Sequence, residues 1–249
     1  MNRRTLFQQL LFGVAGVSVG GLGCASMAAQ ETARRFVDPP GDESALVASR
    51  IDKVEALLRD GRQTASAILV DPAHVDLHEW PRFRTAIRDH AEPGTVSLTT
   101  ASEPGTLLVV RGSVLGADGA PSANALVYLY QTSERGWYSD RAVHVGGNSG
   151  DHKHARLFGY VRADKDGKFA VRTIRPGFYP NAGTPAHIHV AIWSATDTAN
   201  VLISEIRFDD CARMTKSMRE QSLREGFVVC PVRSVDGSQV VEPVFRLRR

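Results

Sequence analysis

Residues 159–174 carry the clearest fold signal in the chain: Gly159-Tyr160-Val161-Arg162-Ala163-Asp164-Lys165-Asp166-Gly167-Lys168-Phe169-Ala170-Val171-Arg172-Thr173-Ile174. Two runs rich in β-branched and aromatic residues flank an Asp-Gly turn, which is the usual pattern of a β-hairpin. We therefore predict paired strands at Gly159–Ala163 and Lys168–Ile174, joined by a turn at Asp164–Gly167.

Similar short runs occur on both sides of this segment, separated by turn residues such as Ala117–Pro121. Short strands at this spacing, with Gly and Asp in the turns, indicate a β-sandwich. Pro243 suggests that the last strand lies at a sheet edge. The other predicted strands are Leu107–Leu115, Ala125–Tyr130, His187–Trp193, Val201–Phe208 and Val240–Leu247.

The residues before 105 have a helical character. In Glu43–Leu58 apolar residues repeat at helical spacing, and Gly61 follows as a stop signal. Shorter helices are predicted around Pro81–His90 and at Met214–Arg224. The sequence thus predicts a mainly β protein in three parts: a signal peptide at 1–29, a linker and helical N-terminal arm at 30–104, and a β-sandwich domain at 105–249.

The N-terminus has the pattern of a twin-arginine export signal. Arg3 and Arg4 precede a Gly-containing apolar stretch, Leu10–Val17, which is too short for a comfortable membrane span. Small residues at Ser26–Ala29 suit cleavage. We predict a periplasmic protein with no stable membrane span after processing; acylation of Cys24 as a lipoprotein and an uncleaved anchor stay open as alternatives.

The net charge bears on the class of partner, and the cysteine content bears on disulfide formation. The 249-residue chain has a formal net charge of +3, and removing residues 1–29 lowers it to +1. This gives no electrostatic case for a nucleic acid or an anionic membrane. Cys211 and Cys230 remain in the mature chain, and an oxidising compartment favours a disulfide between them.

Two histidines occupy alternate positions in Pro185-Ala186-His187-Ile188-His189-Val190-Ala191-Ile192-Trp193. Because side chains alternate between the two faces of a strand, both imidazoles project from one face. Such a pair can supply two adjacent metal ligands, or it can be two ordinary, partly buried histidines. Imidazole binds iron, zinc and copper alike, so the histidines alone do not choose a metal.

Two tyrosines in distinctive segments indicate which metal the site binds. Tyr138 ends Gln131-Thr132-Ser133-Glu134-Arg135-Gly136-Trp137-Tyr138, and Tyr179 lies in Thr173-Ile174-Arg175-Pro176-Gly177-Phe178-Tyr179-Pro180. A tyrosinate is a hard anionic oxygen donor, and two of them neutralise two of the three charges of ferric iron. The four residues together predict a mononuclear Fe(III) site.

From about Gly105 to Phe208, this order of motifs resembles the intradiol ring-cleavage dioxygenases, the family of protocatechuate 3,4-dioxygenase and catechol 1,2-dioxygenase. The resemblance implies a transthyretin-like β-sandwich and a non-haem Fe(III) that cleaves a catechol-type aromatic diol with O2 to a muconic acid-type product. It implies that Tyr138 and His189 are equatorial ligands, and that His187 and Tyr179 are axial. It further implies that Tyr179 leaves the metal when substrate binds, and that the chain forms a homo- or hetero-oligomer.

The chain departs from the family pattern near the substrate. Thr184 stands where family members usually carry an arginine that offsets negative charge, and Glu205 falls near a common glutamine. Tyr130 replaces a usual tryptophan. Arg172 or Arg175 could supply the missing charge.

Two other functions stay open at this point. One is a non-catalytic transthyretin-like binding module of the cell envelope, and the other is a zinc or copper site on the same scaffold. Three further histidines lie in a loop that, by the resemblance, borders the active site: His144, His152 and His154.

Overall fold

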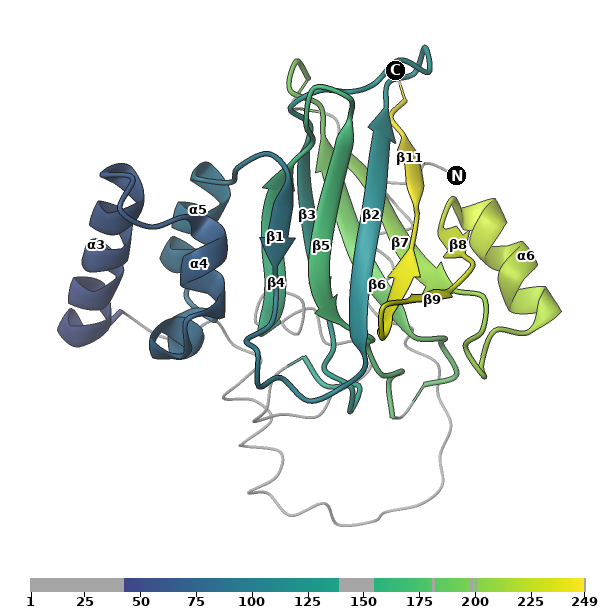
Figure 1. Cartoon of the computed structure of the whole chain (residues 1–249), viewed down its shortest axis with the longest axis horizontal. Coiled ribbons are helices and arrows are strands. Elements are labelled where there is room, and N and C mark those ends of the chain that lie inside the picture. The colour runs from purple at the N-terminus through teal and green to yellow at the C-terminus, as the bar shows by residue number, and fades with distance from the viewer. Residues whose placement is uncertain (1–42, 139–154, 181, 198, 200, 249) are drawn as a thin grey trace, which may run out of the picture.

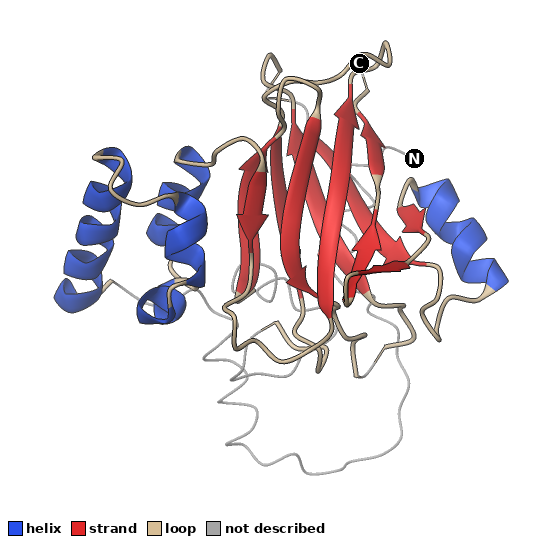
Figure 2. Cartoon of the chain, viewed as in Figure 1, coloured by secondary structure: helices blue, strands red, loops and turns tan. Residues whose placement is uncertain are grey.

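The computed structural model describes residues 43–138, 155–180, 182–197, 199 and 201–248. In this part of the chain two β-sheets pack face to face, with helices at both flanks (Figure 1). The secondary structure is mainly β in the sandwich, and most of the helix precedes it in the chain (Figure 2). The β-sandwich and the helical character of the N-terminal region, both predicted from the sequence, are confirmed.

One sheet has six strands in the order β1-β5-β2-β10-β9, and β11 also pairs with β2. The other has five strands in the order β4-β3-β6-β7-β8. The strands of the first are β1 (Thr95–Ser97), β2 (Leu107–Leu115), β5 (Lys168–Ile174), β9 (Arg233–Val235), β10 (Ser238–Val241) and β11 (Val244–Arg246). Those of the second are β3 (Leu126–Gln131), β4 (Leu157–Arg162), β6 (His187–Trp193), β7 (Val201–Phe208) and β8 (Val228–Cys230).

The predicted hairpin at 159–174 is wrong in its pairing. Both strands and the turn exist, and the amide of Gly167 donates to the Asp164 carbonyl at 3.0 Å. However, β4 pairs with β3 in one sheet, whereas β5 pairs with β2 and β1 in the other. The turn therefore carries the chain across the sandwich, because burying the apolar faces of both strands against each other stabilises more than pairing their edges.

The predicted last strand, Val240–Leu247, is interrupted. Pro243 has no amide proton and cannot donate to a ladder, so β10 ends before it and β11 begins after it. Its carbonyl still accepts from the amide of Ser113 at 3.0 Å, which keeps both short strands alongside β2. β11 pairs with β2 alone, in agreement with the edge position expected at Pro243.

The alternation of side chains along β6 separates core from site. Ile188, Val190 and Ile192 are buried between the sheets and join one continuous apolar core. His187 and His189 project from the opposite face of the same strand. The apolar residues of β6 thus fix the strand, and the strand in turn fixes where the two imidazoles point.

The N-terminal helices pack on one flank of the sandwich and α6 lies on the other (Figure 1). α3, α4 and α6 begin at side-chain caps from Ser44, Thr64 and Thr215, each of which accepts an amide of the first turn. β1 precedes residue 105 and yet pairs with β5. The helices are α3 (Ala45–Arg59), α4 (Ala65–Val70), the 3-10 helix η1 (Pro72–Leu77), α5 (Pro81–Asp89) and α6 (Lys216–Glu225). Among the described residues, none of the helices has the length and apolar character needed to cross a membrane.

The expected disulfide is absent, because Cys211 and Cys230 are both free, buried thiols. Burial, reinforced by the nearby Asp209 carboxylate, raises the pKa of Cys230 to about 12. Thiol–disulfide exchange requires a thiolate, so this environment keeps Cys230 in its unreactive form.

Candidate metal centre

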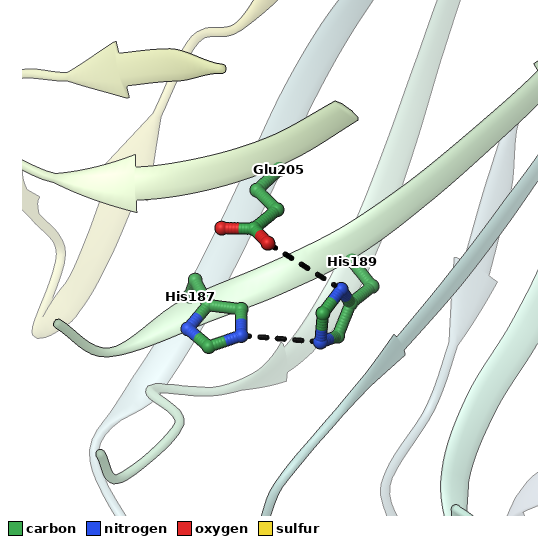
Figure 3. Close-up of side chains that lie close together, drawn as sticks. All are labelled: His187, His189 and Glu205. Carbon is green, nitrogen blue, oxygen red and sulfur yellow. Dashed lines mark hydrogen bonds and ion pairs between the residues drawn. The ribbon is translucent and has the colours of Figure 1, made fainter. Parts of the chain in front are cut away.

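The two histidines of β6 present their Nε2 atoms to a common point. The Nδ1 atom of His187 lies 2.7 Å from the Pro185 carbonyl oxygen, which can only accept, so Nδ1 carries the proton. The Nδ1 atom of His189 faces the carboxylate of Glu205, which favours the same tautomer (Figure 3). The two Nε2 atoms, 3.1 Å apart, are left with their lone pairs toward the site.

The two tyrosines come from loops at the ends of different sheets. Tyr138 follows β3 by seven residues and Tyr179 follows β5 by five. Backbone and side-chain hydrogen bonds tie the two loops together: the amide of Gly177 donates to the Ser133 carbonyl at 2.9 Å, and the Thr132 hydroxyl donates to the Gly177 carbonyl at 2.8 Å. The tyrosine hydroxyls meet as a result.

Two glycines, each placed two residues before a tyrosine, make this approach possible. A Cβ added at Gly136 would lie 2.1 Å from the Phe178 carbonyl oxygen, and one added at Gly177 would lie 2.2 Å from the Glu134 carbonyl oxygen. Gly136 also has φ of +80°, a conformation that L side chains rarely adopt. The Gly-x-Tyr spacing therefore has a steric cause, since only glycine lets the two backbones touch.

Four donor atoms converge at one point. The Tyr138 hydroxyl oxygen lies 2.9 Å from Nε2 of His189, and the Tyr179 hydroxyl oxygen lies 3.0 Å from Nε2 of His187 and 3.1 Å from Nε2 of His189. The two hydroxyl oxygens also contact each other directly. The structure thus brings together all four residues that the sequence singled out.

This donor set fits a metal ion. Two ligand atoms bound at right angles, each about 2.1 Å from one ion, lie about 3.0 Å apart, which matches the oxygen–nitrogen and nitrogen–nitrogen separations found here. Burial, with the neighbouring Tyr179 and Tyr130, raises the pKa of Tyr138 well above its usual value, so this phenol ionises only if a cation is beside it. Two phenol oxygens and two imidazole nitrogens are hard-to-intermediate donors that suit ferric iron.

Tyr130 and Glu205 flank His189 on either side in the sheet. The Tyr130 ring stacks on the His189 imidazole, with centroids 4.5 Å apart and planes 13° from parallel. Glu205, on β7, is directly opposite His189 in the strand register. Burial opposes ionisation of the Glu205 carboxyl, but the neighbouring His187 and His189 imidazoles and the Arg207 guanidinium outweigh this effect, so its pKa lies below the usual value.

His187, His189 and Glu205 are close enough to suggest a metal triad of their own. The close-up argues against it, because Glu205 faces Nδ1 of His189 whereas His187 faces Nε2 (Figure 3). One imidazole cannot bind the same ion through both nitrogens. Glu205 therefore lies outside the ligand set formed by the two tyrosines and the two histidines.

The helical arm supports the tyrosine side of the site. The amide of Arg156 donates to the Tyr138 carbonyl at 2.8 Å, and the Arg156 carbonyl accepts from Nδ1 of His78 at 2.8 Å. Arg84, which is also buried, donates to the carbonyl of Ala155 at 3.1 Å and to the hydroxyl of Tyr128 at 2.6 Å. The arm thus fixes residues 155 and 156, which in turn hold the backbone of Tyr138.

Arg213 performs a similar task for the other tyrosine. Its guanidinium donates to the Tyr179 carbonyl at 3.0 Å and to the Ala182 carbonyl, and it covers the Phe178 ring at 3.6 Å. Sequence reasoning missed both His78 and Arg213, because each acts on a residue distant in the chain. The pairing of Arg207 with Glu205 could have been predicted from the sequence, because the two residues are two positions apart on one strand and so share a face.

Of the two arginines expected to replace the missing charge, one is paired elsewhere and the other is exposed to solvent. Arg175 forms a two-armed ion pair with Asp210, and the side chain of Arg172 is exposed on β5. Thr184 is partly buried just before β6 and carries no charge. The loop histidines His144, His152 and His154 lie outside the described residues.

Comparisons with known proteins point to one family, the dioxygenases. A family model described as dioxygenase matches residues 79–248, which is more than half of the chain. The chain is 28% identical over 165 residues to catechol 1,2-dioxygenase of Acinetobacter baylyi, covering 57% of this chain and 49% of that protein. It is 33% identical over 96 residues to the protocatechuate 3,4-dioxygenase beta chain of Burkholderia cepacia, covering 36% and 39%.

Among solved structures, the dioxygenase domain of a dioxygenase–carbohydrate-binding fusion from Streptomyces sp. SirexAA-E is 27% identical, with a TM-score of 0.49, covering 63% of this chain and 88% of that one. The chain belongs to the intradiol ring-cleavage dioxygenase family. It spans about half the length, or less, of the curated relatives it matches.

Proposed function

We propose that the chain is a non-haem Fe(III) dioxygenase that cleaves a catechol-type aromatic between its two hydroxyl carbons and inserts both atoms of O2. The observation that carries the proposal is the meeting of two phenol oxygens and two imidazole nitrogens at separations of about 3 Å. A binding module has no need of four converging donors, and the two phenols favour ferric iron over zinc or copper.

Bound Fe(III) would act as a Lewis acid and a template, drawing electron density from a chelated diol so that the ring reacts with O2. Tyr138, His187 and His189 would hold the ion, since all three are fixed by β6 or by the arm. Tyr179 is less buried than Tyr138, so its oxygen is the one suited to leave and to accept a proton from an incoming hydroxyl. Stacking on Tyr130 keeps the His189 ring in its plane.

The substrate is proposed to be a catechol without a strongly anionic substituent. With Tyr179 displaced and protonated, ferric iron, one tyrosinate and a diol dianion sum to zero charge, and Thr184 brings no cation to offset the negative charge that develops during oxygen attack. The loss of one such stabilising group costs on the order of 3–4 kcal/mol of barrier in other enzymes. A carboxylate on the ring would make this sum negative, and the neutral Thr184 does not compensate for it.

The proposal is tested with the purified, iron-loaded protein. We expect a broad visible absorption from tyrosinate-to-Fe(III) charge transfer, about one iron per chain, and O2 uptake with catechol that exceeds the uptake with protocatechuate. The product is expected to absorb as a muconic acid. A protein that stays colourless after reconstitution with ferric iron would contradict the proposal.

We further propose export through a twin-arginine-type signal at residues 1–29, and an oligomeric mature protein. The paired Arg3 and Arg4 before a short apolar stretch support the first proposal. Cell fractionation with and without a functional twin-arginine translocase tests it, and acyl labelling of Cys24 distinguishes a lipoprotein. Light scattering of the mature chain tests the oligomeric state.

A further inference from the structure

Glu205 is positioned by the sheet to serve one histidine. In the antiparallel pairing of β6 with β7, His189 and Glu205 are direct partners, so their side chains lie next to each other on the same face. The Glu205 Oε1 atom is 3.8 Å from Nδ1 of His189, on the side of the ring away from the converging donors (Figure 3). A small shift of about 0.8 Å brings this pair to hydrogen-bond distance.

The other oxygen of the same carboxylate is held firmly. Oε2 accepts from Nε of Arg207 at 2.8 Å, and a second nitrogen of that guanidinium lies equally close. Arg207 is fixed in turn, because it donates to the Ser222 hydroxyl of α6 at 2.8 Å and covers the Phe227 ring at 4.5 Å. Glu205 thus has one anchored oxygen and one oxygen that points at His189.

The two histidines therefore differ in what their Nδ1 protons face. His187 faces a backbone carbonyl, that of Pro185, and His189 faces a carboxylate. A carboxylate partner fixes the tautomer and raises the basicity of a metal-bound imidazole more than a neutral acceptor does. Stronger donation favours the higher charge on the metal, so this difference bears on the balance between Fe(III) and Fe(II).

We infer that Glu205, held by Arg207, is a positioning residue that accepts the Nδ1 proton of His189 and preferentially stabilises ferric iron at the site. The inference rests on the proposed function, since it assumes that the site holds iron. It concerns the metal's affinity and reduction potential, and both are measurable without turnover. Arg207 thereby acts on the metal through two intervening side chains, those of Glu205 and His189.

The test compares Glu205→Gln with wild type in the full chain. Glutamine keeps the shape and can still accept from Arg207, but it removes the charge that His189 faces. Loss of such a partner weakens metal binding by about 10–100-fold. If only the affinity for Fe(III) falls and that for Fe(II) is unchanged, each tenfold loss of ferric affinity raises the one-electron midpoint potential by about 59 mV. Spectroelectrochemical titration gives the potential, and chelator competition gives the ferric affinity.

Glu242→Gln is the matched control, because the Glu242 side chain forms an exposed ion pair with Arg233. It should leave the potential unchanged. Should Glu205→Gln yield little folded protein, Glu205→Asp keeps the charge for Arg207 while withdrawing the carboxylate from His189, and the same rise is expected. A potential and a ferric affinity equal to wild type in the Glu205 variants would overturn the inference. Failure of the wild type to bind iron would instead overturn the proposed function.

Discussion

Gly177→Ala separates the two tyrosine loops and so tests how the site is assembled. The new Cβ would lie 2.2 Å from the Glu134 carbonyl oxygen and 2.6 Å from the Gly136 amide nitrogen, where ordinary contacts begin at 3.4 Å. The Tyr179 loop must therefore move by about 1 Å. Both neighbours are backbone atoms, so no side-chain rotation relieves the clash.

The size of the effect follows from the metal geometry. Metal–ligand distances tolerate about 0.2 Å, so a loop displaced by about 1 Å cannot keep both tyrosine oxygens bound. We expect ferric affinity to fall at least about tenfold. Overpacking of this kind also costs about 1–3 kcal/mol, which lowers Tm by about 2–4 °C per kcal/mol in a domain of this size.

Chelator competition, charge-transfer absorbance per iron and thermal unfolding of the metal-free protein measure these effects. Gly183→Ala is the control, because it lies four residues beyond Tyr179 and an added Cβ would meet nothing within 4 Å. It should behave as wild type. Ferric binding and charge-transfer absorption that survive unchanged in Gly177→Ala would refute the steric role of this glycine.

Three other predictions concern single side chains. Tyr138→Phe and His189→Ala should each lose iron, the visible absorption and any O2 uptake together, and activity retained by either variant would remove that residue from the ligand set. Burial lowers the pKa of His78 to about 4, below its usual value of 6.5. Its neutral form therefore contributes about 3 kcal/mol at and above pH 6.5 that is lost as pH falls toward 4, and urea unfolding should show this slope in wild type but not in His78→Gln. Arg213→Met removes two charge-assisted hydrogen bonds to the Tyr179 loop, so we expect a loss of about 1–3 kcal/mol in thermal unfolding and faster iron release to a chelator.

The sequence predicted the long strands well for a definite physical reason. β2, β5, β6 and β7 have the predicted bounds because each carries enough apolar residues for a pattern to stand out. The three-residue strands β1, β8 and β9 were missed, since so few residues show no period. The pairing of β4 and β5 was mispredicted because an Asp-Gly turn fixes only local backbone angles, and those angles do not specify which sheet the next strand joins.

The candidate ligands were predicted by donor chemistry, whereas their supports were not. Tyr138, Tyr179, His187 and His189 stand out because of their short motifs. Nothing near Tyr138 in the sequence points to His78, sixty residues earlier, as part of the network that holds its backbone. Long-range hydrogen bonds of this kind depend on the tertiary fold and leave no local pattern.

The contacts of His78 and Arg84 with residues 155 and 156 limit how this site can be transplanted. A chain cut at residue 105 would lose the helices that hold the Tyr138 backbone. It would also lose β1, leaving the edge of β5 open to pairing with another molecule. Grafting the four ligands onto another protein therefore requires the N-terminal helical arm as well as the sandwich.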